Sequence, residues 1–494
     1  MPVSILPRRP GLVIALAGLL AVTACTPDPT PPASGDPAGT SLVIGVAHEP
    51  ASLDPLQGYA PYGAAKIYDG LVEHQPGGTM KATLATALPL PSADGLSWTA
   101  HLRDDVSFTD GSAFDAAAVV AAYGKVADSP LHDRFWMLSK VTSVDKTTVR
   151  FDLSRPYAAF LDLLVLGIPA QTSTPQKPVG TGPYEVSSWQ QGQRLVLTAN
   201  KAYFGGRPAI TTVTLEFIPD DELRAQRMRD GKLDGTELPA QLSRGFGGGL
   251  TVVEQRGADM RAVSFSDQGV TADPAFRLAL NLAVDRQDAV NKALLGKGQP
   301  LSLPMPPALA EFIEPGTVIE HDVTRAKTTL DAAGWVPGAD GVRVRAGTRA
   351  EFTLSYPGTD VTSRDLAGAF ADAAAAVGIK VTAEAGNKTQ PALVTFGDPF
   401  DPDTALYSTL HTTGGQVAKD LDEARTALDP AARAVAYRAM QRSYATAPAM
   451  VVLAVPTHTY VLRENWTGYT PVVDATGADY TWGPWWNLQG WTPN

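Results

Sequence analysis

The sequence has 494 residues, of which 44% are hydrophobic and 18% charged, proportions ordinary for a globular protein. Its 51 acidic residues outnumber its 40 basic ones, which gives a formal net charge of −11. Phosphate binding needs a basic face, so this balance argues against a nucleic-acid partner and against electrostatic adhesion to anionic lipid. A chain of this length can form two lobes, each with a large core.

The first 25 residues have the pattern of a secretory signal. Arg8 and Arg9 supply positive charge, and the apolar stretch 11–21 is shorter than the about 20 residues that cross a bilayer. The LAVTA string before Cys25, the single cysteine of the chain, is similar to the bacterial lipobox, in which a small residue precedes a lipid-modified cysteine. We expect residues 1–24 to be a signal peptide and Cys25 to carry a lipid anchor. The alternative is an ordinary signal peptide with a chance cysteine.

A proline-rich segment follows the cysteine. Residues 26–40 (TPDPTPPASGDPAGT) contain five prolines and no large apolar side chain. Such a segment cannot bury a core, and its prolines favour extended geometry. With Cys25, it predicts a tether over 25–40 that holds the folded part at the outer face of the cell membrane. No later apolar run reaches 18 residues, so the sequence predicts no further membrane span.

The remaining chain alternates between strand and helix patterns. Apolar and polar residues alternate most clearly at 211–218, which predicts a strand. The clearest helix start is at 114–126, where Asp115 precedes an Ala/Val-rich run. Further strands are predicted at 42–47, 97–102, 147–153, 194–197, 262–265, 351–356, 379–382 and 450–455, and further helices at 222–230, 274–295, 324–333, 363–377 and 430–447. This alternation predicts an α/β fold.

Motifs that would indicate catalysis are missing from the sequence. The phosphate-binding pattern G-x-x-x-x-G-K-[ST], the nucleophile pattern G-x-S-x-G and the zinc pattern H-E-x-x-H do not occur. The seven histidines are scattered, with no pair at helical spacing that would form a local metal site. Gly245–Gly249 fails the spacing of a dinucleotide loop and is interpreted as a flexible connection. We therefore expect a binding protein without a cofactor rather than an enzyme.

The positive signal is a series of short motifs in chain order. They lie at 49–55 (EPASLDP), 67–73 (IYDGLVE), 102–114 (LRDDVSFTDGSAF), 180–184 (GTGPY), 200–207 (NKAYFGGR), 275–285 (AFRLALNLAVD), 322–335 (DVTRAKTTLDAAGW) and 397–402 (GDPFDP). Together they resemble the peptide/nickel class of bacterial extracytoplasmic solute-binding proteins, family 5. Each motif alone is weak, but the ordered series extends over most of the chain.

The resemblance implies a periplasmic-binding-protein-like fold of two lobes with a hinge between them and an extra subdomain inserted in lobe one. The boundaries we expect are 41–56, 173–261 and 456–494 for lobe one, 57–172 for the insert and 262–455 for lobe two. Such proteins enclose a ligand by hinge closure and present the lobes to a membrane permease. The implied partners are a small-molecule or short-peptide ligand and the permease and ATPase subunits of an ABC importer, with the binding protein itself a monomer.

Within this class, peptide binders receive the amino group of the ligand on a carboxylate in the aspartate-rich loop. Asp398 matches that position and is flanked by Phe396. A carboxylate facing an ammonium forms a charge-assisted hydrogen bond. The alternative is that Asp398 caps a turn, as aspartate commonly does. Tyr62 and Trp136 complete the ligand-binding residues that the resemblance implies.

Nickel binders of the same class carry an aromatic–Gly–x–Pro–aromatic–Asp–Pro string, which 396–402 fits. There the metal arrives in a small organic chelate held by arginine and one histidine, for which Arg134 and His411 are candidates. The alternative for His411 is a surface loop. The sequence is shortened between Gly386 and Pro391 and lacks the usual N-P-x-[YF]-D string, so it departs from both groups. Outside this class, a secreted hydrolase or a sensory surface lipoprotein are the competing functions.

Overall fold

The computed structural model describes residues 40–386, 391–475 and 480–494. The predicted signal peptide, the lipidation site Cys25 and the tether up to residue 39 lie outside the described residues. Among the helices in the described part of the chain, none is long and apolar enough to cross a membrane.

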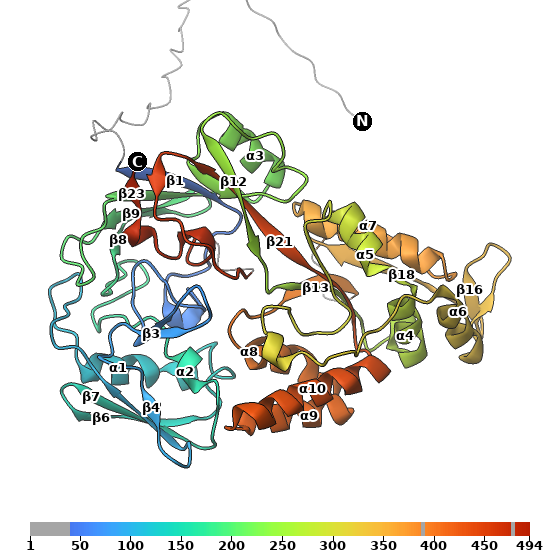
Figure 1. Cartoon of the computed structure of the whole chain (residues 1–494), viewed down its shortest axis with the longest axis horizontal. Coiled ribbons are helices and arrows are strands. Elements are labelled where there is room, and N and C mark those ends of the chain that lie inside the picture. The colour runs from blue at the N-terminus through green and yellow to red at the C-terminus, as the bar shows by residue number, and fades with distance from the viewer. Residues whose placement is uncertain (1–39, 387–390, 476–479) are drawn as a thin grey trace, which may run out of the picture. The chain divides into compact units, whose positions relative to one another are not determined.

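Strand β21 (Val451–Arg463) connects the two halves of the fold. Its first residues pair antiparallel with β13 (Met260–Ser264), and its last residues pair with β12 (Leu250–Arg256) and β11 (Gly235–Glu237). In Figure 1 it crosses from the half of the molecule that contains β13 to the half that contains β1 (Ser41–Val46). Nearly all of its residues are buried, as expected for a strand covered on both faces.

These strands belong to one 12-stranded sheet. Most of it follows the order β19-β18-β20-β13-β21-β11-β1-β10-β9-β8, and β12 and β14 add pairs to β21. The other strands of the sheet are β8 (Tyr184–Gln190), β9 (Arg194–Ala199), β10 (Thr212–Phe217), β14 (Gly298–Pro300), β18 (Glu351–Tyr356), β19 (Lys380–Ala385) and β20 (Ala392–Phe396). The predicted α/β class with two lobes is thus confirmed. The predicted boundaries at 261 and 455 fall inside strands β13 and β21, and these boundaries stay predictions.

A second antiparallel sheet lies within the predicted insert 57–172. Its order is β4-β5-β7-β6. The strands are β4 (Leu90–Pro91), β5 (Ser97–His101), β6 (Leu138–Asp145) and β7 (Thr148–Leu153). Helix α1 (Ala116–Tyr123) buries its apolar residues in the same core as this sheet. The Asp115 carboxylate accepts the N–H groups of Ala117 and Ala118, so the predicted helix start is confirmed.

The helices after β13 surround its end of the sheet (Figure 1). They are α4 (Pro274–Ala283), α5 (Arg286–Ala293), α6 (Val323–Ala332), α7 (Val361–Ala375), α8 (Pro402–Leu410), α9 (Gly415–Thr426) and α10 (Pro430–Thr446). Earlier in the chain lie the short α2 (Phe160–Leu163) and α3 (Asp221–Arg229). The helices after β13 and strands β13, β18 and β20 share one large hydrophobic core.

The single helix predicted over 274–295 is wrong, because the structure has two helices there. Val284 is extended, with φ −84° and ψ 116°, and it separates α4 from α5. The Asp285 carboxylate accepts the N–H of Asp288 and so caps the start of α5. The cap satisfies a backbone donor that a new helix leaves open, which favours a break over continuation. The apolar period continues through the break, and for this reason the pattern looked like one helix.

The GTGPY loop, 180–184, packs directly on the backbone at Ile67. A Cβ added at Gly180 would lie 2.1 Å from the carbonyl oxygen of Ile67, and one at Gly182 would lie 2.4 Å from its carbonyl carbon. The Thr181 hydroxyl also donates to the buried Asp69 carboxylate at 2.8 Å. These contacts give the motif a structural role in packing against residues 67–69.

We expect Gly182→Ala to lower the free energy of unfolding by about 1–3 kcal/mol, because the backbone atoms of Lys66 and Ile67 cannot yield to the methyl group. The measurement is urea denaturation followed by circular dichroism. Gly77→Ala is the matched control, since a Cβ at Gly77 meets no atom within 4 Å. Equal stability of the two variants would contradict the close approach.

Candidate ligand-binding cavity

A cavity of about 590 Å³ lies between the predicted insert and the segment 397–425. Its lining comprises Pro61, Tyr62, Pro130, Asp133, Arg134, Trp136 and Tyr157 on the first side, and Gly397, Asp398, Asp403, Thr404, Ala405, Tyr407, Ser408, His411, Thr412 and Arg425 on the second. Of the predicted site residues, Tyr62, Arg134, Trp136, Asp398 and His411 therefore meet at one cavity, and Phe396 is the exception. The volume of the cavity suits a small organic ligand.

Asp398 lines the cavity and also caps the turn that follows it. Its Oδ1 accepts the N–H groups of Phe400 (2.8 Å) and Asp401 (3.1 Å), and its Oδ2 accepts the Thr404 hydroxyl (2.5 Å). The residue is 6% exposed. These contacts are those of an aspartate that caps a turn, which was the alternative to ligand binding for Asp398. A carboxylate has about four lone-pair sites, so this arrangement leaves one for a ligand donor.

The next acidic residues begin helix α8. Asp401 accepts the N–H of Asp403 at 2.8 Å, which caps the helix, and both its oxygens accept from the buried Arg433 at 2.6 and 2.7 Å. Pro402 stands at the first helical position, where no N–H is needed. The sequence Asp-Pro-Asp therefore fixes where the helix starts and which way its first turn faces.

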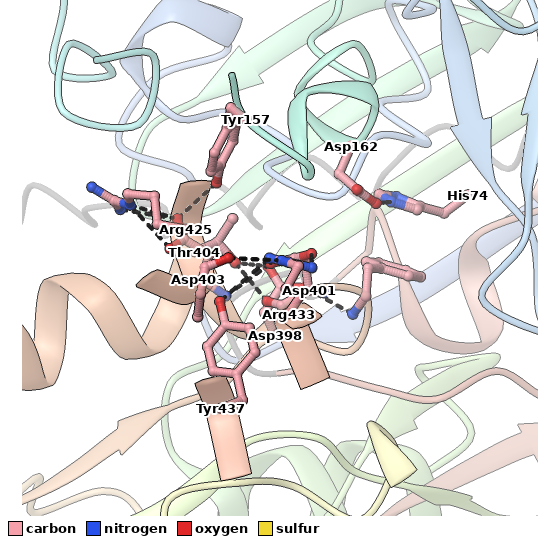
Figure 2. Close-up of polar contacts among 12 residues, drawn as sticks. His74, Tyr157, Asp162, Asp398, Asp401, Asp403, Thr404, Arg425, Arg433 and Tyr437 are labelled. Carbon is pink, nitrogen blue, oxygen red and sulfur yellow. Dashed lines mark hydrogen bonds and ion pairs between the residues drawn. The ribbon is translucent and has the colours of Figure 1, made fainter. Parts of the chain in front are cut away.

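Asp403 is the centre of a polar network between the two sides of the cavity (Figure 2). Its carboxylate accepts from the Arg425 guanidinium at 2.9–3.1 Å and from the Tyr157 hydroxyl at 2.7 Å. The Asp403 side chain is 0% exposed, so its charge is compensated almost wholly by Arg425. Burial, followed by the charge of Asp403, raises the pKa of Tyr157 well above its ordinary value, so its hydroxyl stays a donor. Tyr157 belongs to the predicted insert, and the bond therefore joins it to α8.

Arg425 also stacks on aromatic rings. Its guanidinium carbon lies 3.1 Å from the centroid of Tyr407 and 5.0 Å from that of Trp136. Trp136 in turn meets Tyr157 edge to face at 5.8 Å. The Trp136 indole N–H is buried without a hydrogen-bond partner in the described structure. This cation–aromatic wall offers a flat surface to a ligand.

Arg134 has a different environment from Arg425. Its guanidinium donates to the carbonyl of Pro61 at 3.2 Å. Within the ranges that the structure describes, no carboxylate forms an ion pair with it. The neighbouring Asp133 is fully exposed and interacts with His132 at 3.1 Å. Arg134 therefore brings an uncompensated positive charge to the cavity wall.

His411 lies at the cavity edge but faces an acidic neighbour. Its Nε2 is 3.2 Å from Asp422, and its ring stacks on Tyr407 with centroids 4.2 Å apart. The side chain is 34% exposed, between a buried and a surface position. Across the described residues, no cluster of three or more His, Cys, Asp or Glu side chains has the arrangement of a metal site.

Phe396 is the predicted site residue that the structure does not bring to this cavity. It ends β20, pairs with Met260 of β13 and packs against the core of that half. Sequence reasoning also missed Tyr157, Asp403, Tyr407 and Arg425. Asp403 had a local signal in the Asp-Pro-Asp string at a helix start, but Arg425 follows it by 22 residues and no motif links them.

The fold agrees with comparisons to known proteins. A family model described as bacterial extracellular solute-binding proteins, family 5 middle, matches residues 79–417. The chain belongs to this family. Family 5 proteins are the solute-binding components of ABC importers. These binding components act outside the cytoplasm and are not enzymes. The predicted family is thus confirmed.

Relatives and solved structures extend the comparison. Protein XP55 of Streptomyces lividans is 37% identical over 497 residues, which covers 92% of this chain and 91% of that protein. The nickel-binding periplasmic protein of Escherichia coli K12 is 29% identical over 351 residues, 64% of this chain and 66% of that protein. The structure of NikZ from Campylobacter jejuni in complex with Ni(L-His) has a TM-score of 0.84 at 22% identity, covering 92% of this chain and 99% of that one. The structure of AppA from Bacillus subtilis with a nonapeptide has a TM-score of 0.79 at 22% identity and the same coverage.

We expect Arg425→Leu to destabilise the protein by about 3–5 kcal/mol, because it leaves the Asp403 carboxylate buried without a cation. Tyr157→Phe, which removes one hydrogen bond, should cost about 0.5–1.5 kcal/mol. Chemical denaturation measures both. Arg349→Leu is the control: Arg349 pairs with Asp340 on the surface, where its loss should cost at most about 1 kcal/mol. A loss at Arg425 no greater than at Arg349 would contradict the network.

Proposed function

We propose that this protein is a lipid-anchored solute-binding protein that captures a short peptide or peptide-like solute and delivers it to an ABC permease. Cys25 supplies the anchor, and the cavity between the predicted insert and α8 holds the ligand. The observation that carries the ligand class is Arg134, whose charge faces the cavity without a carboxylate partner in the described chain. A ligand carboxylate completes this site, because a guanidinium binds a carboxylate through two parallel hydrogen bonds.

A second charge supports a zwitterionic ligand. Asp398 lines the same cavity and keeps lone-pair capacity beyond the turn that it caps. Burial, followed by the charge of Asp398, raises the pKa of the Tyr62 hydroxyl, and Arg134 opposes the rise. Tyr62 therefore lies near both charges, the negative one on the α8 side and the positive one on the insert side. A peptide presents an ammonium and a carboxylate to match them.

The test compares dipeptides with their C-terminal amides by titration calorimetry. For the wild-type protein, we expect L-Ala-L-Ala to bind about 10–100-fold more tightly than its amide, because a hydrogen bond to a charged group such as the half-buried Arg134 is worth about 1.5–3 kcal/mol. Arg134→Gln should bind both forms equally and weakly. Arg150→Gln is the control, since Arg150 lies on the sheet of the insert and pairs with Asp152. Unchanged preference for the free acid in Arg134→Gln would sink the assignment.

The second candidate is a nickel chelate, which His411 and the fold of NikZ favour. His411 lines the cavity opposite Arg134, and NikZ, similar in fold, was solved with Ni(L-His). Since the described residues offer no preformed metal cluster, the organic chelator supplies most of the ligands in this case. Arg134 holds the carboxylate of the chelator in the same way that it holds that of a peptide.

Calorimetry with nickel in the presence and absence of L-histidine separates the two candidates. For a chelate binder, we expect binding only with both components and a loss of about tenfold or more in His411→Ala, because one metal ligand is removed. His132→Ala is the control, because His132 is exposed and does not line the cavity. Binding of the chelate that is indifferent to His411→Ala would remove this histidine from the site.

A further inference from the structure

Phe400 does not line the cavity, although Asp398 and Asp403 on either side of it do. Its ring instead stacks on His74, with centroids 3.5 Å apart and an angle of 5° between the planes. It also meets the edge of Trp482 at 5.1 Å and the ring of Tyr62 at 5.9 Å. Phe400 is thus inserted into an aromatic receptacle formed by three residues.

The receptacle is rigid. Tyr62, His74 and Trp482 are 8%, 3% and 1% exposed. The two ring nitrogens of His74 lie 3.1 Å from the carbonyl of Tyr62 and 3.0 Å from the carboxylate of Asp162, and Figure 2 shows the second contact. The Trp482 indole donates to the carbonyl of Val473 at 2.8 Å. Hydrogen bonds thus orient both polar aromatic rings against which Phe400 packs.

This aromatic cluster lies between two cavities. Tyr62 lines the cavity described above, and Ala475, which packs in the same buried cluster as Tyr62 and Trp482, lines a second cavity of about 250 Å³. The residues before and after Phe396 in the chain line different cavities. Thr395 lines the second cavity, and Gly397 lines the first. The Tyr62 hydroxyl donates to the carbonyl of Gly397 at 3.4 Å.

The second cavity differs from the first in its charges. Arg261 pairs with Asp360 at 3.2 Å and with Asp259 at 3.5 Å. His458 pairs with Glu237 at 2.7 Å and with Asp259 at 2.5 Å. Each of these groups already has a partner of opposite sign, whereas the Arg134 guanidinium at the first cavity donates only to a backbone carbonyl among the described contacts.

We propose that the aromatic cluster of Tyr62, Phe400 and Trp482, which Phe400 completes, partitions one cleft into two chambers and thereby limits the length of the ligand. The inference rests on the proposed function, because it takes the chamber of Arg134 as the ligand site. Short peptides fill that chamber. A longer chain meets the Phe400–Tyr62 partition and can pass only if the aromatic cluster opens. Phe400 is thus a specificity-determining residue that does not contact the short ligand.

The test measures affinity along a series of L-alanine peptides of two to six residues. In the wild-type protein, the hexapeptide should bind at least about tenfold more weakly than the dipeptide. In Phe400→Ala, this ratio should fall below about threefold, with dipeptide affinity unchanged. Phe204→Ala, which truncates another half-buried phenylalanine that lines neither cavity, should keep the wild-type ratio. Equal affinity for both lengths in the wild-type protein, or an equal loss for both in Phe400→Ala, would overturn the partition.

A second measurement separates this proposal from the proposed function. Crystal structures of the wild-type protein and of Phe400→Ala should show two separate cavities in the first and one continuous cavity from Arg134 to Ala475 in the second. If no alanine peptide binds either protein and the cavities merge, the peptide ligand is wrong and the partition stands. If the cavities stay separate in Phe400→Ala, the partition is wrong whatever ligand binds.

Discussion

Three carboxylates within six residues govern the geometry of the candidate site. Asp398, Asp401 and Asp403 are 6%, 5% and 1% exposed. An ionised carboxylate taken out of water costs several kcal/mol unless hydrogen bonds or an opposite charge compensate it. Each of the three therefore requires a partner at a fixed distance. Asp398 takes backbone N–H groups, Asp401 takes Arg433 and Asp403 takes Arg425.

These requirements position the elements around the cavity. Because Arg433 belongs to α10 and Arg425 to α9, the two ion pairs hold both helices against the start of α8. Arg425 is then committed to Asp403 and stacks on Tyr407, so its charge is not available to a ligand. The positive charge that remains at the cavity wall comes from Arg134, on the other side. The buried carboxylates thus decide indirectly which arginine at this cavity keeps its charge available to a ligand.

The sequence predicted the fold class, the family and most helix starts, because these depend on local patterns and on motifs in order. Asp115 and its helix are an example, since the cap and the apolar run are adjacent in the chain. The error at 274–295 arose where an apolar period continued through a capped break at Asp285.

For the site, sequence reasoning gathered Tyr62, Arg134, Trp136, Asp398 and His411 through family resemblance and placed Phe396 there as well. It could not find Arg425 or Tyr157, because both act through contacts with Asp403 between distant segments. It could not distinguish Phe396 from Phe400 either, since both are aromatic residues of one short string. The two rings differ in direction. Phe396 packs against the core of one half, and Phe400 enters the aromatic receptacle of the other half.

The distribution of charge also bears on closure. A ligand shifts an equilibrium between open and closed forms only by its difference in affinity for the two. Strand β21 runs through both halves, which restrains their relative motion to bending about that strand. A carboxylate that contacts Arg134 alone interacts with one side of the cavity, so its binding free energy changes little when the halves approach. Under the proposed function, a zwitterion that also reaches Asp398 gains a second charge-assisted bond only in the closed form, so a peptide-like solute would favour closure more than a carboxylate that contacts Arg134 alone.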